Sequence, residues 1–295
     1  MIGERFFPSL NHAPRAFPLP TITAESTIPR LIHQTFKSHE LPVELRENIE
    51  KIKALNPGWT HRIHDDADIE AFIADVYGPE VLAYYHRINP KYGAARADLF
   101  RYLLLYKLGG VYLDIKSTLA LPLDDILQPG ESYVLSQWKN GKDEQHAGWG
   151  CARELRHFPG GEFQQWHIVA APGHPFLRAV IENVLCNIDR YNPWLHGTGS
   201  AGVFRVTGPV AYTLAILPLL ASHKHRIASD RTLGFGYTLF QSASHRPLFG
   251  THYAKQTESV ILMQGAAKIP AALYNLTKRA KRRVWRILRN FGLPV

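Results

Sequence analysis

Four charged side chains of types that act on anionic substrates fall within one stretch, residues 92–121. Asp98 and Arg101 lie three residues apart in a helical pattern, which makes them neighbours on the helix surface. Asp114 follows a short β-rich run, and Lys116 lies two residues beyond it. Carboxylates placed in this way hold a divalent cation against a diphosphate, whereas a lysine can offset diphosphate charge directly. A solvated ion pair on a helix is the plainer interpretation of Asp98 and Arg101.

A helix, a glycine stop and a strand are predicted to position these side chains. Apolar residues recur at i, i+3, i+4 and i+7, which is one face of a helix. They are Leu99, Tyr102, Leu103 and Tyr106. The glycine pair at 109–110 ends the helix, because glycine accepts the left-handed backbone that helix C-termini need. Residues 111–113 are β-rich. Since side chains alternate along a strand, Tyr112, Asp114 and Lys116 should point to one side if the strand continues that far.

This arrangement resembles the core of glycosyltransferase family 32, the DXD-type sugar transferases, and more distantly the glycosylating bacterial toxins. The segments that carry the resemblance are residues 28–35, 56–59, 65–66, 97–102 and 109–114, with weaker matches at 171–175 and 207–209. The resemblance covers residues 28–125 well. Several ordered motifs at family-like spacing are more specific than a lone DXD sequence, which is common by chance.

The resemblance implies an α/β fold of GT-A type, with a Rossmann-type mixed sheet flanked by helices. It also implies retaining transfer of a sugar from a UDP- or GDP-sugar to a glycan or lipid-linked acceptor, in bacterial surface polysaccharide synthesis. By resemblance, Asp98 and Arg101 bind donor-sugar hydroxyls, and Tyr112 lies beside the sugar or the nucleotide. The leaving diphosphate is strongly anionic and needs electrostatic stabilisation. Asp114 and Lys116 lie where that stabilisation is expected.

One position departs from the family pattern. The family motif ends in a second aspartate, where this chain has Lys116 two residues after Asp114. A protonated lysine cannot ligate a hard cation, so one expected ligand of Mn²⁺ or Mg²⁺ is missing. Either Lys116 offsets the diphosphate charge, with the metal weakened or absent, or Asp114 holds a metal with help from elsewhere in the chain. A third interpretation is that Lys116 points to solvent.

Further candidate donor contacts lie at the predicted ends of other elements. Ligands of α/β sheets bind beyond the carboxyl ends of strands, and helix N-termini offer free N–H groups to anions. These rules and the resemblance select His33, Gln34, Thr35, His167, Thr207, Gly208 and His252, with His245 as the competitor for the last. The structural alternatives are a buried histidine in the sheet and simple capping of the helix that follows Gly208.

Length and composition favour one large globular domain with terminal extensions. The chain has 295 residues, of which 45% are hydrophobic, enough for a sizeable core and too many for a disordered protein. The predicted divisions are an N-terminal arm over residues 1–27, a catalytic domain over 28–265 and a basic helix over 266–295. Residues 138–159 are predicted to form an irregular loop over the site that governs acceptor selectivity.

Positive charge is concentrated near the C-terminal end. The net charge is +9, and residues 259–295 hold eight lysines and arginines and no acidic residue. Apolar residues recur at helical spacing over 270–291, with basic residues between them, which is typical of a helix on an anionic membrane surface. Docking of this helix against the body of the protein is the alternative.

A second class of function is a non-catalytic basic protein, derived from a transferase fold, that binds a membrane or a nucleic acid. Basic residues are not spread over the body with interleaved aromatics, as a nucleic-acid groove requires, so no nucleic-acid partner is predicted. Two cysteines, Cys151 and Cys186, fit a reducing compartment. No continuous apolar targeting segment is evident near the N-terminus. We therefore expect a cytoplasmic enzyme, peripheral on the inner membrane face.

Overall fold

The computed structural model describes residues 16–240, 253–265 and 268–290. Its centre is a mixed six-stranded sheet with the strand order β2-β1-β3-β6-β5-β7. The strands are β1 (Leu31–Thr35), β2 (Thr60–His64), β3 (Gly110–Leu113), β5 (Tyr133–Gln137), β6 (His167–Ala170) and β7 (Arg226–Ser229). Strand β1 runs parallel to β2 and β3, β6 is antiparallel to β3 and β5, and β5 is parallel to β7. A second, two-stranded sheet pairs β4 (Thr118–Leu119) with β8 (Phe235–Gly236).

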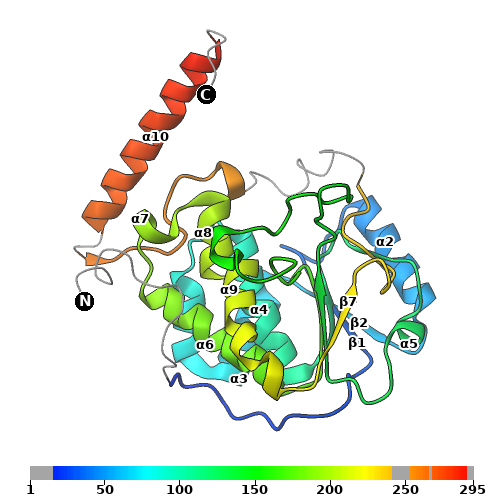
Figure 1. Ribbon diagram of the computed structural model, residues 1–295. Helices are drawn as coiled ribbons and strands as arrows, with labels where there is room; N and C mark the ends of the chain where they lie inside the picture. Colours follow the sequence, from blue (N-terminus) through cyan, green and yellow to red (C-terminus); the bar gives the residue numbers. More distant parts are fainter. Residues whose placement is uncertain (1–15, 241–252, 266–267, 291–295) are drawn as a thin grey trace.

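Helices cover both faces of the six-stranded sheet (Figure 1). One layer consists of α3 (Asp66–Arg87), α4 (Gly93–Leu108), α6 (Pro175–Asp189), α8 (Gly199–Val206) and α9 (Pro209–Ile216). The other holds α2 (Val43–Leu55) and the short α5 (Leu123–Ile126). The remaining elements are α7 (Pro193–His196), the 3₁₀ turns Arg153–Leu155, Leu217–Ser222 and Tyr253–Lys255, and α10 (Lys268–Asn290). The predicted α/β fold with a mixed sheet flanked by helices is confirmed.

The alternation predicted for β3 sorts its side chains between the two layers. Val111 and Leu113 pack in a buried cluster with Ile52 of α2 and Leu123 of α5. Tyr112, between them, packs in the cluster that contains α3, α4 and α6. A strand buried on both faces in this way delivers the residue that follows it to the sheet edge in a fixed orientation.

The glycine stop after α4 is confirmed. Gly109 and Gly110 have φ of 63° and 99°, values that favour glycine. A Cβ atom at Gly109 would lie 2.6 Å from the Cδ atom of Pro172, and one at Gly110 would lie 2.6 Å from the carbonyl oxygen of Leu31. Glycine at both positions therefore lets β3 start directly after α4, pressed against β1.

Helix α3 is interrupted near its middle. Its two halves meet at Gly78, where φ is 77° and the backbone is not helical. Asp65 caps α3 by accepting hydrogen bonds from the N–H groups of Ala67 and Asp68. Residues 138–159 contain only one 3₁₀ turn, which confirms an irregular segment.

The segment after Thr198 contains two glycines and still forms the regular helix α8. In the described part of the chain, Gly199–Ser222 is the one helical stretch long and apolar enough to cross a membrane by length and composition. More than half of it is buried within the protein, as in the core helices of soluble folds.

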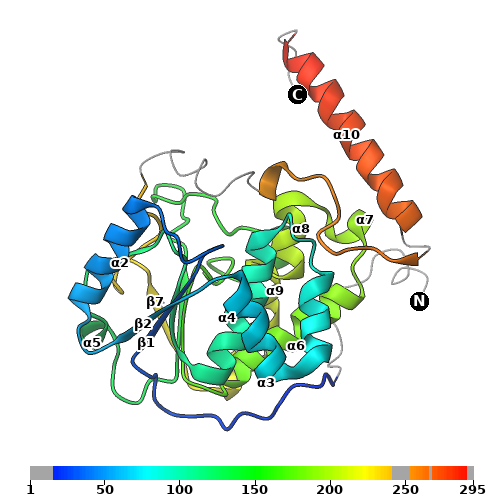
Figure 2. The same ribbon diagram turned by 180° about the vertical axis from the view of Figure 1, so that it is seen from behind.

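The described part of the arm lies along the body. Phe17 and Leu19 are buried, and the Phe17 ring meets Tyr84 edge-on at 5.9 Å between centroids. Helix α10 projects away from the layered body in both views (Figures 1 and 2). The division into arm, catalytic domain and C-terminal helix stays a prediction.

Candidate active site

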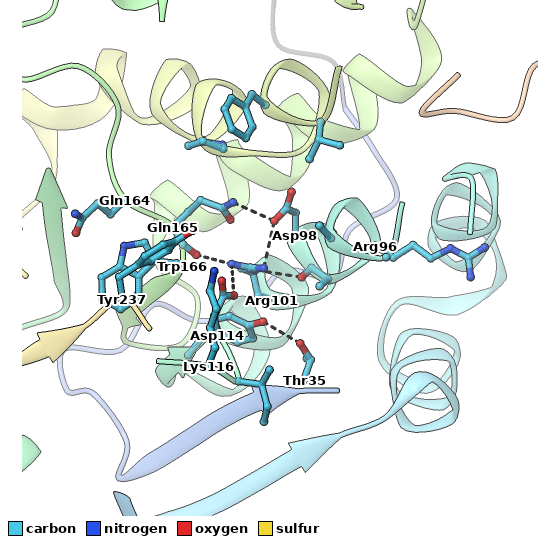
Figure 3. A pocket seen from close by; sticks show the side chains of 18 of the residues that line it. Thr35, Arg96, Asp98, Arg101, Asp114, Lys116, Gln164, Gln165, Trp166 and Tyr237 are labelled. Carbon is cyan, nitrogen blue, oxygen red and sulfur yellow. Dashed lines mark hydrogen bonds and ion pairs between the residues drawn. The ribbon is translucent and has the colours of Figure 1, made fainter. Parts of the chain in front are cut away.

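A cavity of about 980 Å³ opens at the sheet edge where β1 and β3 end and antiparallel β6 begins. Six of the residues singled out in the sequence line it, namely Thr35, Asp98, Arg101, Tyr112, Asp114 and Lys116. Figure 3 shows most of them around Arg101. The topology therefore assembles residues from β1, α4 and the exit of β3 on one surface, which is where α/β sheets bind ligands.

Arg101 is the centre of the site. Its Nη2 atom lies 3.3 Å from Oδ1 of Asp98, and its Nη1 atom lies 3.1 Å from Oδ1 of Asp114. Nη1 also donates to the backbone carbonyl of Gln165 at 2.6 Å. The guanidinium carbon lies 4.5 Å from the Tyr112 ring centroid. A planar guanidinium can join two carboxylates and stack on a ring at once, which an ammonium cannot do.

Asp98 is held by three partners and is buried. Besides the ion pair with Arg101, its Oδ1 accepts from the Gln165 side-chain amide at 3.0 Å. Its Oδ2 accepts from the Thr207 hydroxyl at 2.9 Å. Asp98 and Arg101 are each under 5% exposed, so the alternative of a solvated surface pair is excluded.

Asp114 is the carboxylate that the cavity can reach. Its side chain is 26% exposed, against 3% for Asp98. Its backbone N–H donates to the carbonyl of Trp166, and its carbonyl accepts from the Gln34 amide. Strand β3 ends at Leu113, before Asp114, so the condition for the predicted alternation is not met, but Tyr112 and Asp114 both contact Arg101. The hydroxyl of Tyr112 lies 2.9 Å from that of Thr35.

Burial and charge act in opposite directions on this cluster. Burial lowers the pKa of Arg101, but Tyr112, Asp114 and Asp98 outweigh it, so the net shift is upward and the guanidinium stays charged. Burial raises the pKa of Asp98, while Arg101, Gln165 and Thr207 oppose that rise. The arrangement is therefore a fixed cation flanked by a buried and an accessible carboxylate.

Lys116 lines the cavity rather than an unrelated part of the surface. Its Nζ atom lies 4.0 Å from the centroid of the Tyr237 ring. It faces the same cavity as Asp114, with Arg101 behind Asp114. This face of the cavity therefore presents one cationic group and one accessible carboxylate to an anionic ligand, with the buried cation of Arg101 behind them.

The residues present do not fit a two-carboxylate cation site. Asp114 is paired with a guanidinium, and a lysine occupies the position of the second carboxylate. Among the residues that the structure describes, only His39, Asp65 and Asp68 form a group of three potential metal ligands. None of these three lines the cavity, and Asp65 and Asp68 are engaged in capping α3.

Several predicted donor contacts lie behind the cavity wall. His33, Gln34, His167, Thr207 and Gly208 do not line the cavity, and the side chains of the first four are almost completely buried. Gln34 and Thr207 instead hold Asp114 and Asp98, and Thr207 also ends α8. His33 contacts His64, and His167 contacts Ser136. Their predicted role is corrected to support of the wall. His252 and His245 lie outside the described residues.

Sequence reasoning missed other cavity residues. Gln165 contacts both Asp98 and Arg101 from the loop before β6, and no motif marks it. Trp138, Trp149, Trp166, Tyr237 and Glu162 also line the cavity. Trp138 begins the irregular segment placed over the site and Trp149 lies within it, but Tyr237 is far from it in sequence. Only the tertiary fold shows that these rings meet.

Comparison with known proteins agrees with the site. Residues 42–133 match the family described as "Glycosyltransferase sugar-binding region containing DXD motif". That region contains α4, β3 and the residues Asp98, Arg101 and Asp114. The resemblance of this region to the DXD-containing glycosyltransferases of family 32 is confirmed.

Named relatives are fungal mannosyltransferases. The chain is 32% identical over 139 residues to an initiation-specific alpha-1,6-mannosyltransferase of Candida albicans, covering 44% of this chain and 34% of the relative. It is 30% identical over 159 residues to inositol phosphoceramide mannosyltransferase 3 of Schizosaccharomyces pombe, covering 54% and 38%. The matches thus span little more than a third of these relatives. Among solved structures, the PaToxG glycosyltransferase is similar with a TM-score of 0.48 and 16% identity, covering 66% of this chain and 70% of that one.

Proposed function

We propose that this protein transfers a sugar, by retaining chemistry, from a nucleotide-diphosphate sugar to a glycan or lipid-linked acceptor. The observation that carries the proposal is the contact of Arg101 with both Asp98 and Asp114 on the wall of one cavity, within the segment that matches the sugar-binding region. Buried, multiply bonded groups of this kind keep their geometry when a ligand binds.

Each residue has a defined part in this proposal. Asp114 accepts a hydrogen bond from a donor-sugar hydroxyl. Arg101 contacts its Oδ1 atom, so the Oδ2 atom is available, and the side chain reaches the cavity. Arg101 and Asp98 hold Asp114 in place and contribute the surface beside the sugar. Tyr112 and Thr35, whose hydroxyls meet, bound the cavity on the β1 side, where the nucleotide is expected.

Lys116 takes the charge-offsetting part that a cation has in the DXD pattern. Its ammonium group faces the cavity two residues after Asp114, where the donor diphosphate would lie. A positive group aimed at charge that develops on the leaving diphosphate lowers the barrier to transfer. We therefore propose a divalent-metal requirement that is weak or absent, rather than a second ligand from elsewhere in the chain.

Thermal-shift measurements with UDP-, GDP- and CMP-sugars, each with Mn²⁺ and with EDTA, test this function. At least one donor should stabilise the wild-type protein, in EDTA as well as in Mn²⁺, by the mass-action effect of binding. The same donor should not stabilise Asp114→Ala. No shift with any donor would contradict the proposal. Because the named relatives are mannosyltransferases, GDP-mannose is the donor we expect to bind.

The acceptor is proposed from the same relatives. One is named for inositol phosphoceramide and one for α-1,6-mannosyl transfer, so a lipid-linked or glycan hydroxyl fits both names. The bacterial surface-polysaccharide setting has no support in these fungal relatives. Retention of configuration is tested by nuclear magnetic resonance of the anomeric proton in the product.

We also infer that α10 attaches the protein to an anionic membrane. Ala271 is buried, and Lys278 donates to the hydroxyl and carbonyl of Thr198, so one side of α10 rests on the body. The apolar side chains at helical spacing are instead exposed, by between 51% and 74%. They are Ile269, Leu273, Leu276 and Val284. Docking of the helix on the body, the alternative left open by the sequence, is therefore found at Ala271 and Lys278, whereas these four apolar side chains take no part in it.

The partner of that stripe follows from charge. Residues 259–295 carry eight basic and no acidic residues, which suits an anionic lipid surface, each basic group contributing about 1 kcal/mol. Location on the cytoplasmic face stays part of the proposal. Flotation with phosphatidylcholine vesicles containing phosphatidylserine should capture the wild-type protein at low salt. Leu273→Glu with Leu276→Glu should abolish capture and leave donor binding intact. Equal capture of that variant would contradict the membrane role.

A further inference from the structure

The cavity has a second end, lined by aromatic rings. Trp138 lies at its centre, with ring-centroid distances of 5.1 Å to Trp149, 6.4 Å to Trp166 and 5.4 Å to Tyr237. Tyr237 in turn meets Trp166 at 5.5 Å and Trp149 at 6.0 Å. We call these four rings the aromatic box. They come from the exit of β5, the irregular segment, the loop before β6 and the chain after β8.

The box keeps apolar surface open to the cavity. Trp149 is 47% exposed, which is unusual for a large aromatic residue that contacts other rings. Gly150 lets the segment approach, because its φ is 72° and a Cβ there would lie 2.8 Å from Trp138. An exposed ring inside a concave site is typical of a binding surface.

One carboxyl group belongs to the box. Glu162 lines the cavity, is 8% exposed, and its Oε1 accepts from the indole N–H of Trp138 at 3.0 Å. Burial raises its pKa, while the hydrogen bond from Trp138 opposes the rise. Within the part of the chain that the structure describes, no salt bridge to Glu162 is found. A buried carboxyl without a cation, beside open aromatic faces, suits a neutral hydroxyl-bearing ligand.

The position of the box separates it from the donor end. Figure 3 shows Trp166 and Tyr237 on one side of Asp114 and Lys116, with Thr35 and Arg96 on the other. The expected nucleotide position is the side of Thr35, beyond the carboxyl end of β1. At about 980 Å³ the cavity is at the upper end of the range for ligand sites, roughly 300–1,000 Å³, which leaves room for a second ligand.

We propose that the aromatic box and Glu162 bind a sugar residue of the acceptor. The apolar face of a pyranose stacks on the exposed face of Trp149, and Glu162 hydrogen-bonds a sugar hydroxyl. This places the acceptor across Lys116 and Asp114 from the nucleotide, so that the donor anomeric carbon lies between them. The inference rests on the proposed transferase function and adds to it the position and chemistry of the acceptor.

Tryptophan fluorescence tests the box without an assay of transfer. Methyl α-mannoside, methyl α-glucoside and mannobiose are titrated into the wild-type protein in the presence of GDP or UDP, whichever binds. At least one saccharide should change the fluorescence with saturation. Trp149→Ala should weaken its binding at least about tenfold, and Trp149→Phe should restore most of it. Trp194→Ala, at an exposed tryptophan outside the cavity, is the matched control and should bind as the wild type does.

A second variant separates binding from packing. Glu162→Gln keeps the shape and can still accept the Trp138 hydrogen bond. It should keep the melting temperature of the wild type and weaken the saccharide by about tenfold. Unchanged saccharide binding in both Trp149→Ala and Glu162→Gln would overturn the proposal, as would the absence of saturable binding by the wild type.

Nucleotide binding in the same variants distinguishes the two proposals. GDP or UDP should stabilise Trp149→Ala as much as the wild type. If Trp149→Ala loses the nucleotide and keeps the saccharide, the box holds the nucleobase and the acceptor assignment is wrong. If no nucleotide stabilises the wild type while a saccharide binds the box, the transferase function fails and the saccharide site stands.

Discussion

The Nη1 atom of Arg101 lies 3.1 Å from Oδ1 of Asp114, so a residue of helix α4 fixes the one accessible carboxylate at the exit of strand β3. Arg101 is itself held by the Gln165 carbonyl and by Asp98. The carboxylate that the sequence motif brings to the sheet edge is thus oriented by a buried cation, and the two elements on either side of the glycine pair form one site.

Replacing Arg101 by lysine keeps the positive charge and removes the planar guanidinium group that contacts both carboxylates. A lysine cannot reach both carboxylates and the Gln165 carbonyl from one position. We expect sugar transfer to fall at least about 100-fold, because Asp114 loses its orientation. Steady-state kinetics measures this, with circular dichroism to confirm folding. A rate of transfer within a few-fold of the wild type would show that the guanidinium geometry of Arg101 has no part in catalysis.

Asp98 and Asp114 should differ in their effect on stability. Asp114→Asn, at a partly exposed side chain, should abolish most turnover and change the melting temperature little. Asp98→Ala leaves a buried guanidinium with one carboxylate fewer, which typically costs about 3–5 kcal/mol. Burial therefore makes the Asp98 variant a test of folding as well as of turnover. Urea denaturation compares the two variants, and equal free energies of unfolding would contradict this difference.

Lys116→Asp restores the second carboxylate of the DXD pattern. If Lys116 offsets diphosphate charge, the wild-type protein should transfer sugar in EDTA, and the variant should require Mn²⁺ or Mg²⁺. Transfer rates across a titration of metal ion and of EDTA measure the change. Lys116→Ala is the control, with less transfer and no new metal requirement. The same metal dependence in the wild type and Lys116→Asp would contradict the role given to Lys116.

Buried histidines should make the protein lose stability in mild acid. The pKa values of His33 and His167 are both lowered to about 3, by burial in each case and, for His33, also by nearby charges. In the unfolded chain both have a pKa near 6.5, so between pH 6.5 and 4 the unfolded state binds more protons. The free energy of unfolding therefore falls as the pH drops below 6.5, by up to about 1.4 kcal/mol per pH unit for each histidine.

Urea denaturation at pH 7.5, 6 and 5 measures that slope. His167→Asn should lower the slope of the free energy of unfolding against pH by the contribution of about one proton. Ser136→Ala removes the contact to His167 but keeps the imidazole, so it should keep the slope. An unchanged slope in His167→Asn would mean that His167 does not contribute to acid sensitivity.

The glycine stop gives a test of the α4–β3 junction. Gly110→Ala places a Cβ 2.6 Å from the Leu31 carbonyl at φ of 99°, so we expect a loss of roughly 2 kcal/mol or more. Gly93→Ala, where no atom lies within 4 Å of the added Cβ, should leave stability nearly unchanged. Similar unfolding midpoints for the two variants would show that the junction tolerates a side chain.

The helix–glycine–strand unit could be predicted from the sequence because its signals are local. Periodic apolar residues, two glycines and a β-rich run specify α4 and β3 within a few residues. The apolar stripe of α10 could also be predicted from the sequence, because its helical spacing is a local signal. Local signals also place Asp98 beside Arg101, and the family resemblance adds Asp114.

The remaining features depend on contacts between distant segments. His33 and His167 were predicted to contact the ligand near strand ends, but His33 lies in the middle of β1, and the side chains of both are almost completely buried. The Gln165 contacts and the aromatic box require β6, the irregular segment and β8 to meet across the sheet edge. No local pattern encodes the burial or the meeting of such segments.

Release of nucleoside diphosphate from a nucleotide sugar tests the central claim most directly. The protein is incubated with GDP-mannose and with UDP-hexoses, and product is measured for the wild type and Asp114→Asn at matched concentration. The account predicts release by the wild type with one donor and a fall of at least about 10³-fold in the variant. Equal release by both proteins would contradict the account, and so would the absence of release from every donor in the presence of an acceptor glycan.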